Sequence, residues 1–157
     1  MAILKKQTFS SISTLLALVL AVAGAIAYFV NVGGAGYFEN AAVPNAVTLL
    51  LLSILALAAV VAADQFSISH AAEQILEVVS GALRIAAPAG LMAAAMLLVE
   101  ARAQGLAYIY FSNEEVLAEV QTAANLASAS CAITAIALLA VAALVGVVAA
   151  FGKVKKN

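Results

Sequence analysis

Four long stretches without a charged residue constrain this chain more than any other feature. They cover residues 7–38, 40–63, 85–99 and 120–152. A helix needs about 20 apolar residues to cross the hydrocarbon core of a bilayer. Three of the stretches exceed that length, and the shorter one reaches it when it is extended past Arg84. The sequence therefore predicts four membrane-spanning helices.

The composition indicates the same fold class. Of the 157 residues, 66% are hydrophobic, whereas soluble domains contain about 45–50%. Alanine fills 40 positions, and its small side chain favours both helix formation and close packing of helices. We predict an all-α integral membrane bundle of four transmembrane helices. It forms a single domain, residues 1–157, with spans over approximately 11–32, 43–63, 78–99 and 123–151.

The start of the chain also resembles a signal peptide. Lys5 and Lys6 precede an apolar run that contains several small side chains. The apolar core of a signal peptide is only about 7–15 residues long. Here the uncharged sequence continues from Gln7 to Phe38, so we expect an uncleaved first span.

The basic residues predict how the chain is oriented. Four spans place both termini on one side of the membrane, together with the connection near Arg84. Five lysines lie in the terminal segments, and only Arg102 lies on the opposite side. The positive-inside rule then predicts a multi-pass protein of the plasma membrane with both termini cytoplasmic. Aromatic residues are expected to anchor the outer interface: Tyr37, Phe38, Tyr108, Tyr110 and Phe111.

A short internal repeat has two possible explanations. Tyr37-Phe38-Glu39-Asn40 follows the first predicted span, and Tyr110-Phe111-Ser112-Asn113 follows the third. This similarity favours two tandem helical hairpins related by duplication. The alternative is that interfacial loops use tyrosine, phenylalanine and asparagine independently, as anchors and turn formers.

One patterned polar face precedes the third span. His70, Glu73, Glu77 and Arg84 follow three-, four- and seven-residue spacing, which places them on one side of a helix. A cytoplasmic docking face for a partner and a proton or cation site are two interpretations. The third is a solvated helix face whose Arg84 extends to the lipid headgroups.

Two further features concern helix geometry and packing. Pro88 lies within the third span and predicts a kink there, because proline removes a backbone hydrogen bond. In the fourth span, Ala142, Gly146 and Ala150 repeat every four residues, a spacing that lets helices approach closely.

Ser112 is expected to cap the helix that leads into this span. Polar side chains of the same helix are expected to bond neighbouring helices or, alternatively, to line a pathway: Gln121, Asn125, Ser128, Ser130 and Thr134.

Several functional classes lack their characteristic residues. The chain has one histidine and one cysteine, Cys131, so no catalytic triad, haem pair or cysteine cluster can be assembled. No carboxylate lies in the middle of a predicted span, where proton-coupled transporters usually need one. The net charge of −1 gives no nucleic-acid footprint. We therefore predict a non-enzymatic protein without a catalytic site, a metal or another cofactor.

The segment from Ala101 to Asn113, ARAQGLAYIYFSN, resembles small uncharacterised four-span membrane proteins of Gram-positive bacteria. That resemblance implies a topology and no activity. Two functions remain as expectations. One is an accessory, scaffold or sensory subunit in the lipid bilayer that packs with a second copy, as a homo-oligomer, or with a membrane protein partner. The other is a small transporter or channel subunit.

Overall fold

The computed structural model describes residues 9–64 and 70–152, and every regular element in these ranges is a helix. The elements are α1 (Phe9–Gly33), α2 (Pro44–Ala63), α3 (His70–Phe111), α4 (Glu114–Val120) and α5 (Ala123–Ala150). Four of them, α1, α2, α3 and α5, are long and apolar enough to cross a membrane. The predicted all-α bundle is confirmed.

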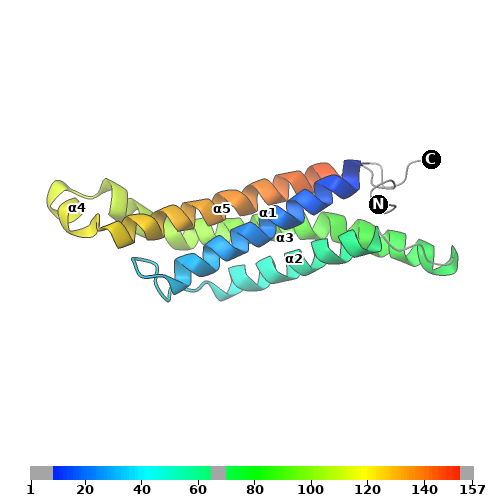
Figure 1. Cartoon of the computed structure of the whole chain (residues 1–157), viewed down its shortest axis with the longest axis horizontal. Coiled ribbons are helices and arrows are strands. Elements are labelled where there is room, and N and C mark those ends of the chain that lie inside the picture. Colours follow the sequence, from blue (N-terminus) through cyan, green and yellow to red (C-terminus); the bar gives the residue numbers. More distant parts are fainter. Residues whose placement is uncertain (1–8, 65–69, 153–157) are drawn as a thin grey trace, which may run out of the picture.

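The four long helices lie side by side in an elongated bundle (Figure 1). The most extensive contact joins α1 to α5, and α3 packs against both α2 and α5. A smaller contact between α1 and α2 completes the ring. The first and last helices of the chain are thus neighbours. We call the end of the bundle near Ser10 and Ala149 the terminal end and the opposite end, near α4, the loop end.

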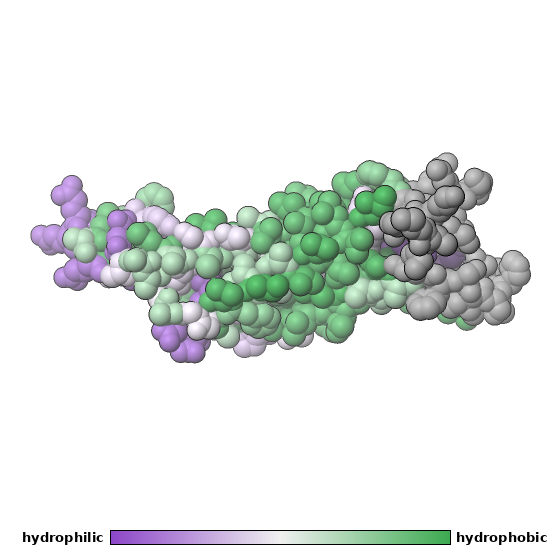
Figure 2. Space-filling model, viewed as in Figure 1, coloured by the Kyte–Doolittle hydropathy of each residue, from purple (hydrophilic) through white to green (hydrophobic). Residues whose placement is uncertain are grey.

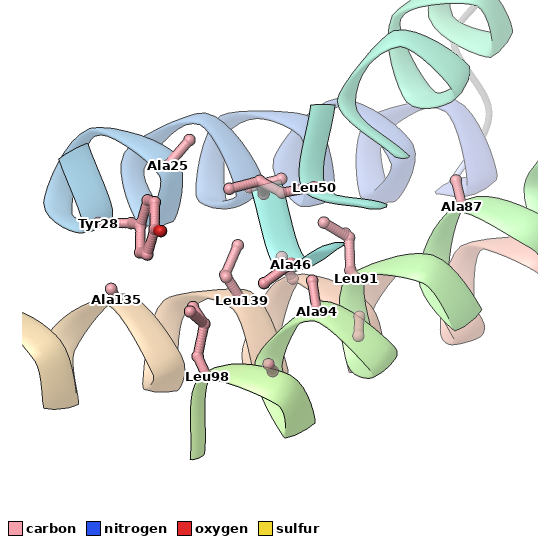
Figure 3. Packing of buried hydrophobic residues seen from close by; sticks show 14 of the residues in the cluster. Ala25, Tyr28, Ala46, Leu50, Ala87, Leu91, Ala94, Leu98, Ala135 and Leu139 are labelled. Carbon is pink, nitrogen blue, oxygen red and sulfur yellow. The ribbon is translucent and has the colours of Figure 1, made fainter. Parts of the chain in front are cut away.

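Alanine sets the spacing at the centre of the bundle. Ala17 and Ala21 of α1 are fully buried, as are Leu139 and Ala142 of α5. A Cβ atom on Gly24 of α1 would lie 2.8 Å from Leu139 Cδ2, so α1 and α5 pack closely there. Leucines and alanines of α2 and α3 fill the rest of this core (Figure 3).

Apolar side chains also cover the outside of the bundle. Large residues on all four long helices are exposed, among them Ile26, Leu55, Met96 and Leu144. Figure 2 shows this apolar surface over the middle of the molecule, with hydrophilic residues gathered at the loop end around α4. Such a surface is suited to lipid chains.

Two helices differ in extent from the predicted spans. The helix α3 continues well past residue 99 to Phe111, because no proline or capping residue interrupts it there. The segment before the fourth span forms a separate short helix, α4. Asn113 caps α4 through a bond from Val116 N, whereas Ser112 Oγ donates to Tyr108 O. Thr122 then caps α5.

Candidate functional site

The terminal end of the bundle holds a buried ion pair. Arg84 of α3 is only 5% exposed, and its Nη2 donates to both carboxylate oxygens of Asp64, at 2.5 and 2.7 Å. Its Nη1 donates to Ser10 Oγ at 2.8 Å and to Thr14 Oγ1 at 3.3 Å. We call these four residues the Arg84 network. The two opposite charges neutralise each other, which is the condition under which charges are tolerated inside a membrane protein.

The Arg84 network connects all four long helices. Asp64 directly follows α2, and Ser10 and Thr14 lie in the first turns of α1. Ser10 Oγ also donates to Ala149 O of α5 at 2.7 Å. Arg84 Nε has no hydrogen-bond partner among the described residues. Asp64 Oδ2 also accepts a hydrogen bond from Ser11 Oγ at 3.0 Å, so the arrangement fixes the positions of the helix ends.

The loop end holds a second buried arginine in a different setting. Arg102 of α3 is 3% exposed, and its Nη2 donates to Ala41 O at 2.6 Å. Its guanidinium carbon lies 4.5 Å from the centre of the Phe38 ring, a cation–π geometry. Within residues 9–64 and 70–152, no carboxylate lies within ion-pair distance of Arg102. This positive charge is therefore balanced by dipoles and a ring instead of an anion.

The connection between α1 and α2 is held against α5. Asn31 Nδ2 donates to Ser128 O and Ser128 Oγ, and Phe38 N donates to the same hydroxyl. Gly36 has a φ of 138°, which favours glycine, and a Cβ there would lie 2.7 Å from Ala124 O. These contacts place Phe38 under Arg102. The buried Asn31 Oδ1 has no hydrogen-bond partner in the part of the chain that the structure describes.

The predicted polar face divides at the end of the bundle. Glu77 is exposed, whereas Arg84 two turns later turns into the bundle. The side chains of His70 and Glu73 lie outside the described residues. Arg84 does not extend to the headgroups as one interpretation expected, because the carboxylate of Asp64 pairs with it inside the bundle.

Pro88 and Gly146, predicted separately, meet in the structure. A Cβ on Gly146 would lie 2.7 Å from Pro88 Cγ, so α3 and α5 approach closely at this point. Ala142 is fully buried and Ala150 is half-buried. The small residues of α5 therefore allow a close contact with α3 of the same chain. The helix α3 is unbroken through Pro88, and the kink stays a prediction.

The predicted outer anchors do not share one environment. Tyr37, Tyr108 and Tyr110 are partly exposed, and Phe111 is 86% exposed. Phe38 is 2% exposed, so its placement among the surface anchors was wrong. Its ring packs beside Gly105, where an added Cβ would lie 2.6 Å from Phe38 Cε1.

The polar residues predicted for the fourth span bond mostly within the chain. Ser128 is buried against Asn31, and Gln121 Nε2 donates to Ile109 O at 3.0 Å. Asn125 Nδ2 donates to Val120 O at 2.8 Å. Ser130 and Thr134 face outward. These side chains do not line a common path through the core.

No metal site is visible in the described residues, which contain no cluster of three or more histidine, cysteine, aspartate or glutamate side chains. Comparison with protein families, with curated proteins and with solved structures finds no match for this chain.

The sequence did not predict most residues of the Arg84 network or the contact between Asn31 and Ser128. Ser10 and Asp64 lie just outside the first and second predicted spans, and Thr14 and Asn31 fall within the first span without a predicted role. One signal was available, because Arg84 and Arg102 are 18 positions apart. That separation is about five helical turns, so both side chains must lie on one face of α3.

Proposed function

We propose that this protein is a non-enzymatic integral membrane subunit that acts as an accessory, scaffold or sensory component through helix packing. One observation carries the proposal: the middle of the bundle is apolar, and the buried charges lie only at its two ends. Between those ends, the one buried polar side chain in the described residues is the hydroxyl of Ser53. One uncharged hydroxyl supports neither a proton relay nor an aqueous path.

The pairing of polar groups supports the same conclusion. The Arg84 network is neutral, and the Asn31–Ser128 contacts join α1 to α5. Bonds of this kind hold helices together in a membrane. A transporter or channel subunit, the alternative function, would need polar groups that water or substrate can reach.

We further propose that the chain resides in the plasma membrane of a bacterium with both termini cytoplasmic. The lysines of the terminal segments and the outer tyrosines favour this orientation. The resemblance of residues 101–113 to small membrane proteins of Gram-positive bacteria favours the bacterial origin. A reporter fused after Asn157 should behave as cytoplasmic and one inserted at Glu114 as external. The reverse pattern would contradict the orientation.

Thiol accessibility tests the main proposal. In a Cys131→Ala background, Ser53→Cys and Leu139→Cys place single thiols in the middle of the core. Glu115→Cys at the loop end and Glu77→Cys at the terminal end are exposed controls. In membranes treated from both sides with a membrane-impermeant thiol reagent, we expect both controls to react and both core thiols to stay unmodified. Core thiols that react as fast as the controls would favour the transporter or channel.

A further inference from the structure

The helix α3 carries a continuous apolar surface on the side away from the bundle. Its members alternate at four- and three-residue spacing, and all are exposed except Ala93, which is half-buried. We call this surface the α3 stripe: Ile75, Val79, Ala82, Ala86, Ala89, Ala93 and Met96. The bundle-facing residues of α3, such as Leu91 and Leu98, lie on the opposite side.

The α3 stripe continues past the terminal end of the bundle. Arg84 contacts Ser10 near the start of α1, and Ser10 in turn contacts Ala149 near the end of α5. Ile75 lies nine positions before Arg84, which is about 13 Å further along the helix axis. Figure 1 shows this part of α3 extending beyond the other helices. By length and composition, the candidate span of α3 begins only at Glu77, so Ile75 precedes it.

The part of the stripe beyond that level is apolar and exposed. Ile75 is 70% exposed and Val79 is 49% exposed, and the neighbouring Val78 is 74% exposed. Ile75 and Val78 are thus large apolar side chains at or before the start of the candidate span. The alanines alone would indicate little in a chain of this composition. The large residues that continue their spacing to the start of the candidate span form an exposed apolar surface of the kind that a protein partner covers.

We infer that the α3 stripe is the surface through which two copies of this chain pair in parallel. A repeat that alternates three and four residues is the pattern by which two helices pack along a left-handed seam. Two copies with one membrane orientation bring the same residues together about a two-fold axis, so one stripe serves both sides. The inference rests on the proposed function and names its partner as a second copy.

Charge and area fit this pairing. Glu77 and Arg84 lie on the far side of α3 from the stripe, so no like charges meet between Ile75 and Met96. The repeat next reaches Glu100, and two Glu100 carboxylates would face each other there, which ends the seam at Met96. With flanking Val78 and Ile85, the stripe exposes on the order of 600 Å² of apolar surface, near the ~800 Å² that each partner contributes to a standard interface.

Disulfide trapping in native membranes tests the pairing. In the full chain with Cys131→Ala, single cysteines at Val79 and Ala82 lie on the stripe, and cysteines at Glu77 and Ser80 are matched controls on the other side of the same turns. Under oxidation, we expect at least five-fold more covalent dimer from Val79→Cys and Ala82→Cys than from the controls. Equal dimer at all four positions, or none at any, would overturn the inference. So would a disulfide from Val79→Cys to a different polypeptide, identified by mass.

A bulky substitution within the α3 stripe provides the second measurement. Ala86→Leu should reduce trapping at Val79→Cys by five-fold or more, whereas Ala137→Leu on the exposed side of α5 should leave it unchanged. Equal trapping in both variants would contradict pairing through the stripe. The reaction of Ser53→Cys with the membrane-impermeant thiol reagent, measured in the same membranes, distinguishes failure of the pairing from failure of the proposed function. Failed trapping with a protected Ser53→Cys overturns the pairing alone, and normal trapping with a reactive Ser53→Cys overturns the proposed function alone.

Discussion

The two ends of the bundle each bury one arginine of α3 and balance its charge differently. At the terminal end, Arg84 is paired with a carboxylate and two hydroxyls. At the loop end, Arg102 has one carbonyl and an aromatic ring. Removing one member of a buried ion pair leaves the other charge uncompensated, whereas removing a cation from a carbonyl and a ring leaves no opposite charge behind. Loss of the arginine side chain is therefore expected to reduce stability much more at the terminal end than at the loop end.

Loss of the Asp64 carboxylate should have the largest effect. Asp64→Asn leaves the Arg84 guanidinium buried without an anion, and we expect it to cost about 3–5 kcal/mol of stability. The measurement is the unfolding midpoint of the purified protein in mild detergent. The double variant Asp64→Leu with Arg84→Met removes both charges and should be clearly more stable than Asp64→Asn. A double variant as unstable as the single one would show that the hydroxyl contacts matter more than the charges.

Truncation of Phe38 should have the largest effect at the loop end. Phe38→Ala removes a buried ring that packs against Gly105 and Arg102, and a loss of about 3 kcal/mol is expected. The matched control is Phe111→Ala, which removes the equivalent residue of the short internal repeat. Because Phe111 is 86% exposed, its loss should change stability by less than about 0.5 kcal/mol. Equal losses in the same unfolding assay would indicate that the two segments are equivalent after all.

A methyl group added to α3 should act in opposite directions at the two ends. Gly105→Ala places a Cβ 2.6 Å from ring atoms of Tyr37 and Phe38 and should destabilise by about 1–3 kcal/mol. Gly81→Ala meets no atom within 4 Å and should stabilise by roughly 0.5–1 kcal/mol through helix propensity. Thermal unfolding of the two variants side by side gives the sign of each change. A stabilising Gly105→Ala would mean that the loop end is loosely packed.

Replacement of Arg102 should have the smallest cost of the four. Arg102→Met removes one hydrogen bond and one cation–π contact and keeps an unbranched apolar side chain, so a loss of about 1–2 kcal/mol is expected. Arg84→Met in the same assay leaves Asp64 unpaired and should cost at least twice as much. Similar costs for the two variants would remove the distinction between the two ends.

The long apolar segments could be predicted from the sequence because they depend on local composition alone. Charge-free runs of about 20 residues have few alternatives to membrane helices. The limits of α3 and the break between α4 and α5 at Gln121 were harder to predict from the sequence, because capping hydrogen bonds determine where these helices begin and end. Asn113 and Thr122 cap the flanking helices, while Ser112 bonds backward to Tyr108 O.

The buried networks depend on which helices become neighbours, and composition does not carry that information. Arg84 and Asp64 are 20 positions apart across a connection, and Ser10 is 74 positions from Arg84. The short repeat also depends on which helices are neighbours. Phe38 is enclosed by α3 and α5, whereas Phe111 at the end of α3 has no helix over it. The matching phenylalanines of the two loops therefore lie in different environments.

The contact between the first and last helices has a consequence for biogenesis. During synthesis α1 enters the membrane before α5 exists, so Asn31 lacks its Ser128 partner and Ser10 lacks Ala149 until translation nears its end. The contact between α2 and α3 can form earlier. We therefore expect an α1 segment that stays associated with the insertion machinery or an insertion chaperone until α5 arrives. Truncation before residue 123 should leave this early intermediate susceptible to membrane quality-control proteases.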